Sequence, residues 1–154
     1  MMTGGSRGHA VIVRRLANSL EKRLDANRWT VLTSDFGVDL GPETIRFPDV
    51  VVDVAGGLFK DLTATAPALV AEILSPSSEK YDLGGKAHEY MRAASLSTYL
   101  VLAQDQAKAW VWDRSETGFP LTPKEIDGHD AIIRIAAFDI NIPMLEIYAG
   151  VEFE

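Results

Sequence analysis

The order of the predicted secondary structure indicates an α/β (α+β) fold in which helices flank a central mixed β-sheet. Three observations support this prediction: an amphipathic helical pattern near the N-terminus, several short runs rich in β-branched residues, and a second helical pattern between two of those runs. The chain has 154 residues, of which 47% are hydrophobic, and this is enough for one sizeable core. We therefore expect a single domain over residues 1–154.

The first predicted element is an amphipathic helix over residues 8–26. Ser6 is a typical helix cap, and apolar residues then recur every four positions, at Ile12, Leu16, Leu20 and Leu24. After Asn27 the period of the pattern changes from that of a helix to that of strands.

Strands follow this helix. Short β-rich runs predict strands over residues 29–33, 37–40, 45–47, 49–54 and 68–74, with a turn at 41–43 and a loop at 55–67. In residues 49–54 the side chains alternate, so that Asp49, Val51 and Asp53 share one face.

The second half of the chain begins with another helix. Pro76 and its neighbouring serines interrupt the strand pattern, and a helix is predicted over residues 82–94. Two strands at residues 98–103 and 107–113 follow, joined by a turn at 104–106. Further on we predict a strand near residues 131–135 and a short helix after Pro143.

The net charge of −7 argues against a protein that coats nucleic acid through bulk electrostatics. The charge is uneven, because residues 1–30 carry six cations against two anions, whereas residues 31–154 carry nine against twenty. The basic N-terminal helix is either a solvated surface or a phosphate-binding surface. No apolar stretch approaches the ~20 residues of a membrane span, no signal peptide is visible, and cysteine is absent, so we expect a cytoplasmic protein.

An unusual glutamate indicates a functional site. Glu72 interrupts the apolar run of the predicted strand over residues 68–74, although burying an unpartnered carboxylate costs several kcal/mol or more. If its strand lies beside the strand that begins near Asp49, the two carboxylates meet on one face and suit a hard ion such as Mg²⁺, with Mn²⁺ as a substitute. The backbone carbonyl of Ile73 could be a further ligand.

Lys86 lies close to these carboxylates in the sequence. At the start of the second helix it could stabilise negative charge on a phosphodiester under attack or orient the attacking water. Asp82 and Tyr90 are four residues away on the same helical face and are candidate supporting groups. The plainer alternative is a surface ion pair between Asp82 and Lys86, with Asp49 capping a strand.

These residues also carry a resemblance to a known family. The segments FPDVVVD, LVAEILSPSSEKYDLGGKAHEY and STYLVL, with a helix led by His9, resemble the Uma-type putative restriction endonucleases of the PD-(D/E)XK nuclease superfamily. The resemblance covers most of residues 9–113. It implies a restriction-endonuclease-like fold and Mg²⁺-dependent phosphodiester hydrolysis, with Asp49 and Glu72 as metal ligands.

Two departures from the family pattern matter. The superfamily lysine usually stands two residues after the glutamate, where this chain has Leu74, so the resemblance assigns that role to Lys86, with Lys80 as a weaker candidate. Members usually carry an acidic residue some tens of positions before the histidine-led helix, whereas this sequence starts eight residues before His9. We therefore expect that residue to be missing and the metal site to be weaker or inactive.

The first functional interpretation is a metal-dependent DNA endonuclease, acting as a homodimer. The alternatives are a catalytically degenerate binding or dimerisation module and a hydrolase of small phosphorylated molecules. His9, His88 and His129 are too scattered for a histidine metal cluster, so we interpret them as surface or helix-packing residues, with a place for His9 near the site as the alternative.

Overall fold

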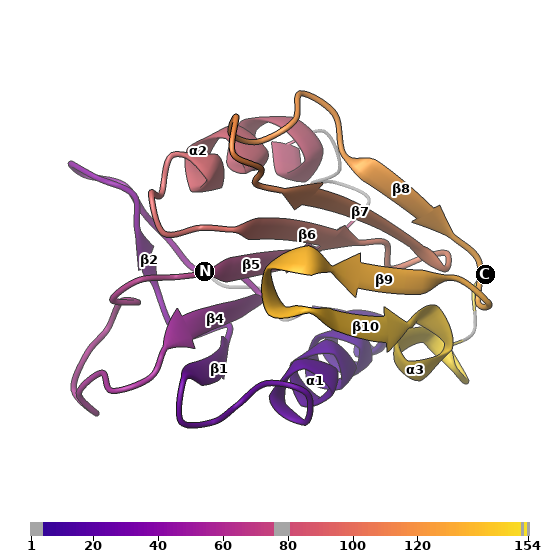
Figure 1. The fold of residues 1–154 in the computed structure, drawn as a ribbon. Coiled ribbons are helices and arrows are strands. Elements are labelled where there is room, and N and C mark those ends of the chain that lie inside the picture. The colour runs from indigo at the N-terminus through magenta and orange to yellow at the C-terminus, as the bar shows by residue number, and fades with distance from the viewer. Residues whose placement is uncertain (1–4, 76–80, 152, 154) are drawn as a thin grey trace.

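The computed structural model describes residues 5–75, 81–151 and 153. Its main feature is a six-stranded mixed sheet with the strand order β1-β4-β5-β6-β7-β8 (Figure 1). In chain order these strands are β1 (Trp29–Thr33), β4 (Val50–Val54), β5 (Leu69–Ile73), β6 (Thr98–Leu102), β7 (Lys108–Asp113) and β8 (Lys124–Asp127). Neighbouring strands are antiparallel except for β5 and β6, which are parallel. The predicted fold class, helices around a mixed sheet, is confirmed.

The remaining elements form two small sheets, three α-helices and two short irregular helices within the described residues. They are α1 (Arg7–Glu21), β2 (Val38–Asp39), β3 (Ile45–Arg46), a π-helical turn (Tyr81–Gly85), α2 (Lys86–Met91), β9 (Ile132–Ile135), a 3-10 turn (Ala136–Phe138), β10 (Ile140–Pro143) and α3 (Met144–Tyr148). Strands β2 and β3 form one antiparallel pair, and β9 and β10 form the other. No described helix is long and apolar enough to cross a membrane.

The main sheet has an apolar cluster on each face. One joins Val50, Val52 and Ala71 to α1, α3 and the β9–β10 pair, and the other joins Val51, Val70 and Tyr99 to α2. Figure 1 shows this arrangement, with α2 on one side of the sheet and α1 and α3 on the other. Because strand side chains alternate, Asp49 and Glu72 belong to the register of the α2 face.

The helices begin and end differently from the prediction. Ser6 caps α1 as predicted, because its side chain accepts a hydrogen bond from the His9 amide, but α1 ends at Glu21 and a turn follows. The second helix is shorter than residues 82–94, because residues 81–85 form a π-helical turn. Strands β8 and β10 were not predicted, whereas the predicted strand near residues 131–135 and the helix after Pro143 are present.

Half of the basic residues of the N-terminal segment bind the C-terminal helix. Arg23 donates to Glu146 at 2.6 Å, and Lys22 pairs with the same carboxylate. Arg15 donates to the carbonyl oxygens of Ile147 (3.0 Å) and Ala149 at the end of α3. These three cations therefore attach α3 to α1 rather than forming a free phosphate-binding surface.

Replacing Glu146 with glutamine is expected to destabilise the protein by about 1 kcal/mol at pH 7, after allowance for solvent screening. The hydrogen bonds from Arg23, Lys22 and Ser19 lower the pKa of Glu146 to about 2 from an ordinary 4.5. Its stabilising effect is therefore complete above about pH 5 and is lost as the pH falls from 4.5 towards 2. Urea unfolding of the wild type and of Glu146→Gln at pH 7, 4 and 3 measures this effect. A difference in the free energy of unfolding that does not shrink as the pH falls would contradict the prediction.

Candidate active site

Asp49 immediately precedes β4 and lies opposite Glu72, which is near the end of β5. The antiparallel register pairs Val52 with Leu69, Val51 with Val70 and Val50 with Ala71. One further step along both strands places Asp49 opposite Glu72, and directly opposed residues have Cβ atoms about 4.5–5.5 Å apart. The structure thus brings together the two carboxylates that the sequence singled out.

Both carboxylate oxygens of Asp49 contact neighbouring groups. Oδ2 accepts a hydrogen bond from the Ile73 amide at 2.8 Å, and Oδ1 lies 3.1 Å from Nε2 of His9. Burial alone would raise the pKa of Asp49, but these two contacts outweigh it and lower the pKa. The N–H and C=O of a residue in an extended strand point the same way, so the Ile73 carbonyl also faces the Asp49 side.

Glu72 is the more deeply buried of the two carboxylates, with 4% of its surface exposed. Its Oε1 accepts a hydrogen bond from the Tyr90 hydroxyl at 3.0 Å and lies 3.6 Å from Nζ of Lys86. Burial raises the pKa of Glu72 to about 8, even though Lys86 opposes the shift, and the nearby Asp49 and Asp82 add to it. The carboxyl group in this apolar strand is therefore contacted by one hydroxyl and one ammonium group, both from α2.

Lys86 approaches Glu72 from the first turn of α2. Its Nζ lies 2.9 Å from Oδ1 of Asp82, which is only 1% exposed, so this is not the surface ion pair of the plainer alternative. Burial would lower the pKa of Lys86, but Glu72 and Asp82 reverse the shift and raise it. The Tyr99 hydroxyl donates to the Asp82 carbonyl at 2.8 Å, which fixes the π-helical turn against β6.

The two alternative lysine positions do not compete with Lys86. Leu74 is buried in the apolar cluster on the α2 side, together with Ala87 and Tyr90. Lys80, the weaker candidate, lies outside the described residues. Among the candidates that the structure describes, Lys86 is the lysine at the two carboxylates.

His9 is the site residue that the main sequence interpretation missed. The imidazole of His9 contacts Asp49, so His9 lies beside the candidate site, where the alternative interpretation placed it. That hydrogen bond raises the pKa of His9. Gly5 leaves room for the ring, since a Cβ at Gly5 would lie 2.7 Å from Nδ1 of His9. The available sequence signal was the position of His9 at the third residue after the Ser6 cap.

The donor set fits a hard cation. Among the described residues, no group of three or more His, Cys, Asp or Glu side chains is arranged to hold a metal ion. Mg²⁺, however, is commonly bound through one or two carboxylates, with water and substrate phosphate completing its shell. Asp49, Glu72 and the Ile73 carbonyl supply oxygen donors of that kind at one end of the β4–β5 pair.

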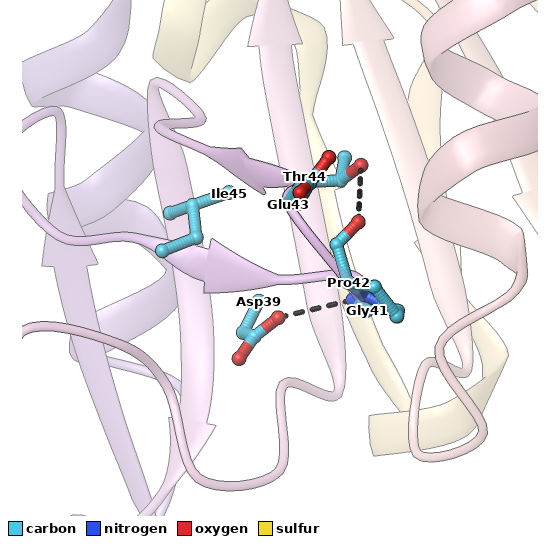
Figure 2. Close-up of a pocket in the computed structure, with 6 residues that line it drawn as sticks. All are labelled: Asp39, Gly41, Pro42, Glu43, Thr44 and Ile45. Atoms are coloured by element: carbon cyan, nitrogen blue, oxygen red, sulfur yellow. Dashed lines mark hydrogen bonds between the residues drawn. The ribbon is translucent and has the colours of Figure 1, made fainter.

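The surface has one hollow beside α1 and another at the β2–β3 hairpin. One, of about 440 Å³, lies between α1 and the end of β1 and includes His9. The other lies at the tip of the β2–β3 hairpin, where Asp39 accepts a hydrogen bond from the Gly41 amide and Thr44 donates to the Pro42 carbonyl (Figure 2). The hairpin hollow contains the carboxylates of Asp39 and Glu43 and none of the predicted site residues.

The mixed sheet with helices on both faces is a restriction-endonuclease-like fold, and one end of its β4–β5 pair carries two opposed carboxylates and a helical lysine. The chain belongs to the Uma2 family, described as "Putative restriction endonuclease", whose model matches residues 1–144. The family resemblance seen in the sequence is therefore confirmed.

Individual relatives agree with this assignment. The chain is 32% identical over 119 residues to the uncharacterized protein slr1290 of Synechocystis sp., and 27% identical over 107 residues to the uncharacterized protein sll1609 of the same organism. These matches cover 76% and 67% of the chain but only 63% and 60% of those relatives. The fold is similar to the crystal structure of "a putative nuclease belonging to DUF820" from Anabaena variabilis, with a TM-score of 0.76, 13% identity, and coverage of 99% and 85% of the two chains.

Proposed function

We propose that this protein is a Mg²⁺-dependent DNA endonuclease that hydrolyses phosphodiester bonds. The supporting observation is the position of Asp49 opposite Glu72, with the ammonium group of Lys86 3.6 Å from Glu72. Its family membership and nuclease-like fold favour this reaction class. Mn²⁺ would substitute for Mg²⁺, because both take oxygen ligands.

Asp49, Glu72 and the Ile73 carbonyl would hold the ion. When bound, Mg²⁺ would supply charge stabilisation for a phosphate group and favour ionisation of a water molecule. The Ile73 amide fixes one oxygen of Asp49, and the Tyr90 hydroxyl fixes one oxygen of Glu72. The protein thus restrains both carboxylates before any ion arrives.

Lys86 would act on the phosphate. In the reaction a water oxygen bonds to phosphorus, one P–O ester bond breaks, the leaving sugar oxygen takes a proton, and the water releases a proton to solvent. Negative charge grows on the non-bridging oxygens during this step. Because Nζ of Lys86 lies beside two carboxylates, it keeps its proton and serves as a positive charge rather than as a general base.

Three further residues act as positioning residues. Asp82 holds Nζ of Lys86, Tyr90 holds Glu72, and His9 holds Asp49. Each contact restrains a group that would meet metal or phosphate, which reduces the reorganisation needed during reaction. We also propose that the protein acts in the cytoplasm and forms a homodimer, in which each of two symmetry-related sites would cut one strand of a duplex.

Replacing Asp49 with asparagine is expected to lower Mg²⁺-dependent DNA cleavage by about tenfold to hundredfold. The amide oxygen could still face the ion, but the negative charge would be lost. Cleavage of a labelled duplex is measured with Mg²⁺ and with a chelator, and Mn²⁺ binding is measured by calorimetry.

Asp53 provides a matched control on the same strand. Its oxygens accept hydrogen bonds from the amides of Thr65 (3.0 Å) and Ala66 (2.8 Å), so its role is to hold the loop before β5. Asp53→Asn should lower the melting temperature but keep the activity of the folded protein. If the wild type binds no Mn²⁺ and cleaves nothing while folded, the catalytically degenerate binding module becomes the better interpretation.

A further inference from the structure

The hollow of about 440 Å³ beside α1 extends away from the candidate site. We call it the α1 groove, and its walls are one side of α1, with His9, Arg14 and Asn18, and the end of β1, with Thr33 and Ser34. Between the polar residues of the helical wall stand the small residues Ala10 and Ala17. An extended chain could therefore approach the helix closely.

Both walls of the α1 groove contact Asp49. From the helical wall, Nε2 of His9 lies 3.1 Å from Oδ1 of Asp49. From the strand wall, the Ser34 amide donates to the Asp49 carbonyl at 3.1 Å. Two contacts from the groove walls therefore reach Asp49, which does not itself line the groove, so the groove adjoins the proposed metal site.

The charge of the α1 groove differs from that of the rest of the chain. The chain has a net charge of −7, yet none of the described residues that line this groove is Asp or Glu. Arg14 is exposed on its wall, whereas Arg15, Lys22 and Arg23 point to α3. Side chains of Arg, Asn, Ser and Thr are common contacts to phosphate oxygens in protein–DNA interfaces.

We propose that the backbone of a DNA strand binds in the α1 groove, with Arg14 contacting a phosphate adjacent to the one that is cleaved. This inference rests on the proposed function and adds the place where the DNA strand binds. Arg14, Asn18, Thr33 and Ser34 contact the sugar-phosphate chain and not base edges, so the groove sets the position of the strand and carries no sequence preference.

The test compares DNA binding by the wild type with that by Arg14→Ala. A fluorescein-labelled duplex is titrated without added divalent metal, so that it stays intact, and anisotropy is read from 50 to 200 mM salt. Arg14→Ala is expected to raise Kd by about tenfold and to reduce the slope of log Kd against log salt by about 1. Alanine is a better helix former than arginine, so α1 stays intact, which a melting curve checks.

Three further variants complete the comparison. Arg28→Ala removes an exposed cation of the same basic segment that lies over the Trp29 ring instead of in the groove, and it should leave binding unchanged. Arg14→Lys should recover much of the lost affinity, because the phosphate contact needs charge. Ala17→Glu introduces a negative charge into the groove and should weaken binding at least as much as Arg14→Ala does.

The outcomes separate this inference from the proposed function. Equal Kd values and salt slopes for Arg14→Ala and Arg28→Ala, with a wild type that cleaves DNA, would overturn the groove assignment alone. Tight binding by Ala17→Glu would also overturn it. A wild type that neither binds nor cleaves DNA would overturn both proposals.

Discussion

Replacing Glu72 with glutamine is expected to reduce Mg²⁺-dependent DNA cleavage by about 1,000-fold while leaving the fold as stable as before or more so. The amide has the shape of the carboxylate and can still accept the hydrogen bond from Tyr90. It removes, however, a buried carboxyl group that faces Asp49 and lies near Asp82, and whose ionisation is opposed by burial and by both of these neighbours. A residue kept only for structure would not show a loss of activity together with a gain in stability.

Thermal unfolding in the presence of Mg²⁺ or Mn²⁺ gives a second measurement on Glu72→Gln. An ion that binds only the folded wild type raises its melting temperature. At an ion concentration one hundred times Kd, binding adds about 2.7 kcal/mol to the free energy of unfolding. The variant should show no such rise. If wild type and variant cleave DNA equally and respond equally to the ion, Glu72 is not a metal ligand and another account of its burial is needed.

The local patterns of the sequence predicted much of the sheet and its first helix. The four-residue repeat through Ile12, Leu16 and Leu20 became the buried side of α1, because helix periodicity is a property of neighbouring residues. In the same way the apolar run around Glu72 became β5, buried along its whole length. A charged residue that persists in such a run is informative because its burial is costly.

Other parts of the structure depend on contacts between distant residues, which periodicity does not reveal. Strand β8 has one buried residue, Ile126, and owes its conformation to pairing with β7. The contact between His9 and Asp49 joins residues forty positions apart, and Glu146 meets Arg23 from the far end of the chain. A sequence can show that such groups are present, but not that the fold brings them together.

The role of Lys86 is predicted to be separable from its effect on stability. Lys86→Met is expected to reduce cleavage by about 100-fold to 1,000-fold and to destabilise the fold by about 3 kcal/mol. Both effects have the same origin, because the ammonium group is the cation that Asp82 and Glu72 share at 2.9 and 3.6 Å. A loss of activity in this single variant would therefore not by itself establish catalysis.

The double variant Asp82→Asn with Lys86→Met resolves this ambiguity. Neutralising Asp82 together with its partner removes the uncompensated buried charge, so stability should return towards that of the wild type. Cleavage should stay low, because the positive charge near the phosphate is still missing. A double variant that regained both stability and wild-type cleavage would mean that Lys86 only balances Asp82, and that the positive charge acting on the phosphate comes from another residue.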